Sequence, residues 1–283
     1  MSLQNFGRKI GLLIADASGE ALDLSGFRVS FTVEKTGAEQ PNTCKLEISN
    51  LSDTTVSKLM TGDLTRIVLQ AGYEDNYAVI FDGNIMTVTH VRNGADFLTS
   101  ITAGDGDKAY SYAVVSQSFA SGCSKTDIAQ AAIGKMAEQG TRGAETSGLD
   151  SATKYPRGRV LYASARDVAR EMAKASDCQW SIQDGRVVFC KTKESLPDRM
   201  AFELSTASGM IGSPVVDKDG VTASCCLNPK LAIYDPIKIE SRYVKGTYKI
   251  LSVKHDGDTH SSTWMTTVKA SAIDQSVQKT VKL

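Results

Sequence analysis

The sequence has no excess of charge of either sign and no long apolar run. Its 32 lysine and arginine residues equal its 32 aspartate and glutamate residues, so it lacks the positive excess with which general nucleic-acid binders hold phosphates. The same balance argues against a polybasic membrane-surface protein. No stretch approaches the roughly 20 apolar residues that a membrane-spanning helix needs. The apolar run at 10–15 is short for a signal peptide, so we expect the protein to stay in the reducing cytoplasm.

The six cysteines are not spaced as metal ligands or as disulfide partners. No C-x-x-C motif has a matching second pair, which argues against a structural zinc site. Cys178 and Cys190 flank a predicted hairpin whose turn is Asp184-Gly185. A two-residue turn places Cys178 opposite Lys191 and directs Cys190 to the other face of the hairpin. We therefore expect all six thiols to be free.

What the sequence does have is apolar alternation with a period of two. Residues 27–34 alternate Phe, Val, Phe and Val with polar side chains, and residues 44–49 continue the pattern. This alternation is typical of strands with one buried face. The first hundred residues therefore predict an antiparallel barrel or sandwich, and strand character returns from about 205 to 273.

The middle of the chain, residues 110–204, has a different pattern. Apolar residues there recur at helical spacing, and serines precede two of the helical stretches as N-caps. The expected elements are a helix at Lys125–Glu138 capped by Ser124, a loop at Gly140–Arg159, a helix at Ala165–Ser176 opened by Ser164, and a hairpin at Gln179–Lys191. Together they predict a small α+β module.

The C-terminal strands repeat the N-terminal ones. Three blocks recur in the same order: Ile67–Leu69 as Ile237–Ile239, Ile85–His90 as Ile250–His255, and Phe97–Ala103 as Trp264–Ala270. Only the loops between the blocks differ in length, as hairpin tips allow. We interpret the chain as mainly β, with two similar antiparallel β-barrels joined by the α+β module. The predicted domains are 1–109, 110–204 and 205–283, and the last can also pair with N-terminal elements.

No constellation of catalytic or ligand residues accompanies this pattern. His90 and His255 occupy equivalent places in the two copies, which favours a structural role, and no Gly-x-Ser-x-Gly motif is present. Asp105-Gly106-Asp107 begins like a calcium loop but lacks the later glutamate. Glu171 and Asp177 have no spacing that suggests a glycosidase pair. We expect no catalytic residue, no cofactor, no metal site and no enzyme activity.

Several short segments resemble one family, the baseplate hubs of contractile phage tails, and in particular the hubs of T-even and Mu-like phages. The segments that carry the resemblance are Pro41–Ser52, Val68–Asp75, Ile80–Gly83, Leu227–Leu231, Asp235–Ile239 and Gly246–Ile250. They cover both ends of the chain and leave Gly140–Arg159 unmatched. Tyr234 departs from the family pattern, which often has glycine at this place.

The resemblance implies a function, a set of partners and a location. Two similar barrels from each of three chains would form a pseudo-sixfold ring that joins a hexameric tail tube to a trimeric central spike. The implied partners are two further copies, the tail tube, spike and tape-measure proteins, and neighbouring baseplate proteins. DNA is implied only as passing cargo, without membrane insertion. The implied location is the virion tail baseplate, after assembly in the bacterial host cytoplasm.

Two other functions stay open at the level of sequence. A tail-tube or distal-tail protein would have a single barrel fold and hexameric assembly. A tail-associated cell-wall hydrolase would need an acid or nucleophile constellation.

Overall fold

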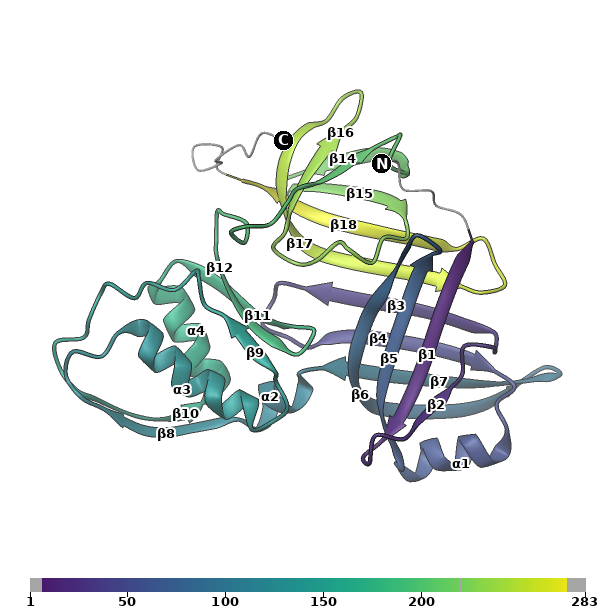
Figure 1. The fold of residues 1–283 in the computed structure, drawn as a ribbon, viewed down its shortest axis with the longest axis horizontal. Helices are drawn as coiled ribbons and strands as arrows, with labels where there is room; N and C mark the ends of the chain where they lie inside the picture. The colour runs from purple at the N-terminus through teal and green to yellow at the C-terminus, as the bar shows by residue number, and fades with distance from the viewer. Residues whose placement is uncertain (1–6, 219, 274–283) are drawn as a thin grey trace.

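The computed structural model describes residues 7–218 and 220–273. Strands dominate it, and one large sheet of 13 strands runs through most of the molecule (Figure 1). None of the helices in these ranges is long and apolar enough to cross a membrane. The mainly β fold with a small α+β insertion, predicted from the sequence, is confirmed.

The large sheet is built from strands of both ends of the chain. These strands are β1 (Arg8–Asp16), β2 (Ala21–Asp23), β3 (Val29–Thr36), β4 (Asn42–Ser49), β5 (Leu64–Tyr73), β6 (Asn76–Asn93), β7 (Asp96–Asp105), β13 (Phe202–Ser205), β14 (Met210–Asp217), β15 (Gly220–Cys226), β16 (Pro236–Glu240), β17 (Lys245–Asp258) and β18 (Trp264–Ala272). Their order is β14-β15-β18-β17-β3-β4-β7-β6-β5-β1-β2, with β16 beside β17 and β13 beside β16. Alternate side chains of these strands are buried, for example Val29, Phe31 and Val33 of β3.

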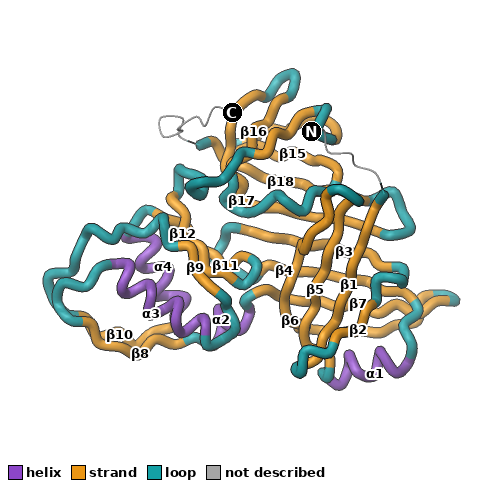
Figure 2. Tube along the Cα trace, viewed as in Figure 1, coloured by secondary structure: helices purple, strands orange, loops and turns teal. Residues whose placement is uncertain are grey.

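The α+β module lies at one end of the molecule, where Figure 2 shows most of the helices gathered. Its elements are α2 (Asp107–Tyr112), β8 (Val114–Phe119), α3 (Lys125–Ala137), β9 (Gly143–Glu145), β10 (Arg159–Ser164), α4 (Ala165–Ala175), β11 (Cys178–Gln183) and β12 (Arg186–Lys191). Ser124 caps α3 in a capping box with Asp127, and Ser164 caps α4. Both predicted helices are therefore confirmed.

The predicted hairpin and its cysteine register are also confirmed. Cys178 lies opposite Lys191 and Cys190 lies opposite Gln179, and all six cysteines are free. The loop expected over Gly140–Arg159 needs a correction. It contains the short strand β9, which pairs in parallel with β12 because the chain there returns alongside the hairpin.

The buried apolar residues form three separate cores. The first core lies within 12–103, with Leu227 and Trp264 added from the far end of the chain. The second core covers 109–189 and belongs to the module. The third core covers 188–270. The domain limits 1–109, 110–204 and 205–283 stay a prediction.

The two hairpins β6–β7 and β17–β18 have the same register, residue for residue. His90 lies opposite Thr99 and His255 opposite Thr266, in agreement with the aligned sequence blocks. Each ladder also contains the same one-residue bulge, directly after Ile85 and after Ile250. The histidine Nδ1 lies 3.0 Å from the threonine Oγ1 in the first pair and 2.8 Å from it in the second.

The duplication extends to whole strands. In the first copy the sheet order is β3-β4-β7-β6-β5, and in the second it is β14-β15-β18-β17-β16. Position by position, β3 corresponds to β14, β4 to β15 and β5 to β16. The internal repeat predicted from three sequence blocks is therefore present in the structure.

The two copies meet where β17 pairs with β3, and we name this contact the internal joint. Residues 252–258 lie antiparallel to 30–36, with His255 opposite Val33. Beside the joint, the Trp264 ring packs edge-on against Phe31 with ring centres 5.4 Å apart, and its Nε1 donates to the Gly72 carbonyl at 3.3 Å. Gly257 leaves room for this packing, because a Cβ there would lie 2.4 Å from the Phe31 ring.

Truncating the aromatic side chain at the joint tests how much the joint stabilises the chain. Trp264→Ala removes a buried ring, so we expect the free energy of unfolding to fall by about 3–5 kcal/mol. Phe97→Ala is the matched control, since Phe97 is the equivalent residue of the first copy and is half-exposed. We expect it to cost less than ~1 kcal/mol in dilute solution. Urea denaturation measures both, and equal losses would contradict the assignment.

Candidate functional site

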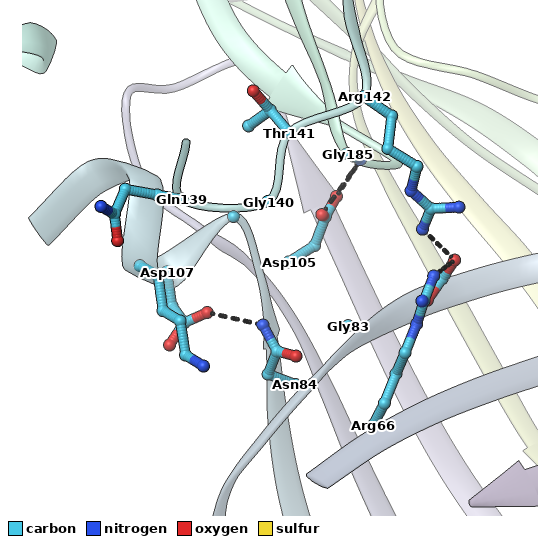
Figure 3. A pocket seen from close by; sticks show the side chains of 13 residues that line it. Arg66, Gly83, Asn84, Asp105, Asp107, Gln139, Gly140, Thr141, Arg142 and Gly185 are labelled. Carbon is cyan, nitrogen blue, oxygen red and sulfur yellow. Dashed lines mark hydrogen bonds and ion pairs between the residues drawn. The ribbon is translucent and has the colours of Figure 1, made fainter. Parts of the chain in front are cut away.

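A polar cavity of about 230 Å³ lies where the first sheet copy meets the α+β module (Figure 3). Its walls come from β5, β6, the β7–α2 turn, the segment after α3 and the β11–β12 turn. The lining contains no histidine, cysteine or serine, so it offers no Ser–His or Cys–His pair. Within 7–218 and 220–273, no group of three or more His, Cys, Asp or Glu side chains could hold a metal ion.

Asp105 is the most perturbed group of this cavity. The last residue of β7, it is buried and accepts a hydrogen bond from the Gly185 amide at 3.1 Å. The pKa of the Asp105 carboxyl is raised to about 7, mainly by burial and also by the nearby Asp184 carboxylate, against the opposing effect of Lys35. Lys35 is itself held by Asp184, with Nζ 2.5 Å from Oδ1. These contacts attach the module's hairpin turn to the first sheet copy.

The opposite wall is an ion-pair cluster centred on Asp82. Arg66 donates to both Asp82 carboxylate oxygens at 2.7 Å, and Arg142 from the module donates at 2.5 Å. Partial burial raises the pKa of Asp82, but the two arginines outweigh this effect and leave the pKa below its usual value. The cluster therefore ties the module to β5 and β6 by charge-assisted hydrogen bonds.

Tyr234 forms a second junction, at strand β11 of the module. Its hydroxyl donates to the Gly37 carbonyl at 2.8 Å and accepts from Ser181 Oγ at 3.1 Å. Its φ of 68° is the left-handed conformation that glycine adopts most easily. The turn therefore keeps glycine-like geometry although a tyrosine occupies it. The fully buried ring joins the second sheet copy to the β3–β4 loop and the module.

Apart from Asp107, the other residues weighed as candidate sites from the sequence lie outside this cavity, in separate structural contacts. His255 is buried, and desolvation lowers its pKa to about 3, whereas His90 is half-buried beside Thr99. Asp107 lines the same cavity as Asp105 and accepts a hydrogen bond there from Asn84. Glu171 binds Arg159 at 2.8 Å. Asp177 turns the chain after α4 in a left-handed conformation.

One feature that sequence reasoning missed is a set of exposed apolar residues on two strand edges. Met86 and Val91 of β6 are exposed in the first copy, as is Phe97 of the neighbouring strand β7, and Ile211, Val215 and Val216 of β14 are exposed in the second. The sequence signal was apolar residues on both faces of one strand, combined with the repeat. Such paired exposed edges are typical of surfaces that bind another chain.

A comparison with protein-family models identifies the family of this chain. The model described as baseplate hub gp41 matches residues 9–270. The chain belongs to the baseplate hub gp41 family. The resemblance to phage hub proteins noted in the sequence is thereby confirmed, and the protein is a structural component of a phage tail baseplate.

Solved structures share the fold of this hub protein at low sequence identity. A 43 kDa tail protein of prophage MuSo2 from Shewanella oneidensis matches with a TM-score of 0.64 and 8% identity, over 94% of this chain and 97% of that one. A tail protein from Neisseria meningitidis MC58 matches with a TM-score of 0.63 and 7% identity, over 94% and 96%.

A third solved structure with this fold is a component of a type VI secretion system. The E. coli c3393 protein, described as a type VI secretion component similar to the T4 tail proteins gp27 and gp5, has a TM-score of 0.56 and 9% identity. The match covers 88% of this hub chain and 74% of that chain. A comparison with curated protein sequences gives no match.

Replacing Asp105 tests whether the cavity is a structural junction. Because the folded hub retains a proton on Asp105 up to about pH 7 and the unfolded chain loses it near pH 4, stability from this group falls as pH rises between those values. Asp105→Asn should remove that slope and stabilise the hub at pH 8 by up to about 4 kcal/mol relative to wild type. Urea denaturation at pH 5 and pH 8 measures the difference.

Asp82→Asn is the matched control in the opposite wall. It loses ion pairs that are charged throughout this pH range, so it should destabilise the hub similarly at pH 5 and pH 8. Equal pH slopes in wild type and Asp105→Asn would contradict the account of this cavity.

Proposed function

We propose that this structural hub protein is a symmetry adapter. Three chains, each with two equivalent sheet copies, present six similar surfaces to a hexameric tail tube and three to a trimeric central spike. The observation that supports this proposal most strongly is the identical register of β6–β7 and β17–β18, bulge included. Two sheets that match in register can present the same backbone pattern to six identical partners.

The parts that are not duplicated fit the threefold side of such an adapter. The α+β module occurs once per chain, and helix α1 (Asp53–Thr61) lies only beside the first copy in the described ranges. A ring of three chains would carry three modules. The ionic and tyrosine junctions hold each module firmly to its sheets, as a threefold contact surface requires.

The partners proposed for this ring are the tail tube, spike, tape-measure and neighbouring baseplate proteins. Its place is the virion tail baseplate, with assembly in the cytoplasm of the bacterial host. DNA passes through without tight binding, which agrees with equal numbers of basic and acidic residues. This role requires no catalytic step, and we propose none. A hexameric tail-tube role is the main alternative.

Light scattering of the purified hub at rising concentration tests the adapter role. We expect the average mass to rise toward three times the chain mass and to level off there, because a closed ring has no free surface for a fourth chain. A plateau at six chains would favour the tail-tube function. A mass that stays at one chain at every concentration would contradict the proposal for the isolated protein.

A further inference from the structure

Strands β8 and β10 form a small sheet of their own on the outside of the α+β module. They pair antiparallel over their whole length, and this sheet has no third strand in the described part of the chain. In Figure 1, helices α3 and α4 lie between it and the strands β9, β11 and β12. Val115 and Leu161 on its inner face belong to the apolar core of the module. The other face therefore points away from that core.

This outer face carries large apolar side chains that are exposed. Val160 and Tyr162 of β10 are 80% and 83% exposed, and Val114 of β8 is 47% exposed. Tyr112, which directly precedes β8 at alternate spacing, is 70% exposed. Exposed serines occupy the remaining outward positions of β8. We name this surface the ribbon face, and it consists of Tyr112, Val114, Ser116, Ser118, Val160 and Tyr162.

The pairing of the two strands continues beyond both ends of the small sheet. After β10, the Ala165 amide donates to the Ala113 carbonyl at 2.8 Å. The same register, continued by one residue, brings Arg166 level with Tyr112. Before β10, an isolated bridge pairs Lys154 with Ser124. A basic residue therefore marks each end of the ribbon, whereas the ribbon face between them is uncharged.

The charges of these two segments have one sign only. Residues 113–124 contain no charged residue, and the charged residues of 151–166 are all basic, namely Lys154, Arg157, Arg159 and Arg166. Arg159 binds Glu171 at 2.8 Å, and the other three form no ion pair with any described residue. Asp167 interacts with Arg166 but is bound by Ser164 and Arg170. The ribbon therefore has positive charge left to offer.

We propose that the ribbon face docks a protein segment that presents apolar side chains flanked by carboxylates. Tyrosine and valine supply contact area, the serines supply adaptable hydrogen bonds, and charged residues are absent from the centre, as in the cores of protein interfaces. The basic residues at the ends complement the carboxylates and exclude basic segments. The surface occurs once per hub chain, and this inference goes beyond the adapter function and does not depend on it.

The composition of the ribbon face favours a protein over a nucleic acid. A phosphate backbone is held by cations and polar donors along its length. The centre of this face instead has Val114 and Val160, which can bind neither phosphates nor base edges through hydrogen bonds. Burying these valines against apolar side chains of a partner removes their surface from water. Single-stranded DNA could still stack on the tyrosines, so DNA is included in the test.

Fluorescence anisotropy with a labelled glutamate–tyrosine copolymer tests the docking surface. This probe offers carboxylates and apolar rings, and the purified full-length hub is titrated into it at physiological salt. We expect saturable binding, and no binding of a lysine–tyrosine copolymer, because the ribbon repels cations. Single-stranded and duplex DNA of equal charge are titrated in the same way and should bind more weakly than the acidic copolymer.

The double variant Val160→Thr/Tyr162→Thr removes the apolar centre of the ribbon face. Threonine keeps strand propensity and both positions are exposed, so the variant should unfold at the same urea concentration as wild type. We expect the dissociation constant for the acidic copolymer to rise at least about tenfold, as for the loss of aromatic anchors at an interface.

Val215→Thr/Tyr243→Thr is the matched control in the second sheet copy. The same residue types are 63% and 81% exposed there, and Arg242 lies over the Tyr243 ring at 5.3 Å. This control therefore changes an exposed valine and tyrosine near a cation elsewhere on the hub. We expect its dissociation constant to stay within about twofold of wild type.

Arg157→Gln/Arg166→Gln tests the charged ends. We expect weaker binding of the acidic copolymer and a smaller dependence of the dissociation constant on salt, because screened charge pairs are lost.

Three outcomes would overturn the inference. The first is no binding of the acidic copolymer to wild type, and the second is equal weakening in the ribbon variant and its matched control. The third is DNA that binds more tightly than the copolymer and is released by Arg157→Gln/Arg166→Gln, which would make this surface a nucleic-acid site. The mass from light scattering tests the adapter function separately, since neither double variant changes the large sheet except the control.

Discussion

Strands β3 and β17 come from opposite ends of the chain, with Thr32 and Asp256, 224 residues apart, hydrogen-bonded across the ladder. Their pairing turns two sheet copies into one continuous sheet and fixes the angle between them. It uses one edge of each copy, β3 of the first and β17 of the second. The pairing also shapes the first apolar core, because it brings Trp264 of the second copy into that core.

The α+β module is attached to this sheet by polar contacts and by the third apolar core, which contains Val188 and Cys190 of β12. Lys35 with Asp184, Asp82 with its two arginines, and Tyr234 with Gly37 each fix a direction as well as a distance. Buried hydrogen bonds of this kind tolerate little displacement, because a polar group without its partner is costly. The module therefore keeps one orientation on the sheet.

Much of the fold could be predicted from local sequence patterns. Period-two alternation located the strands, serine caps located α3 and α4, and a two-residue turn fixed the register of Cys178. The repeat was visible because His90 and His255 stand in aligned apolar blocks. The internal joint could not be predicted, since pairing between distant strands depends on register and sheet order. The short helix α1 was missed although Ser52 caps its start and Gly62 ends it in a left-handed conformation. The three-residue strand β9 was missed because it forms only by pairing with β12, which is distant in the sequence. The cavity was missed because Asp105 and Arg142 meet only after the module has docked.

The central claim is that each chain carries two equivalent sheet copies, joined by the pairing of β17 with β3 and matched in the register of β6–β7 and β17–β18. An electron cryo-microscopy map of the assembled baseplate, viewed at the level of the hub sheets, tests it most directly. The proposed adapter function predicts three chains and six similar sheet copies around the ring. A ring of six chains, or a ring in which the two copies of each chain take up unlike positions, would contradict it.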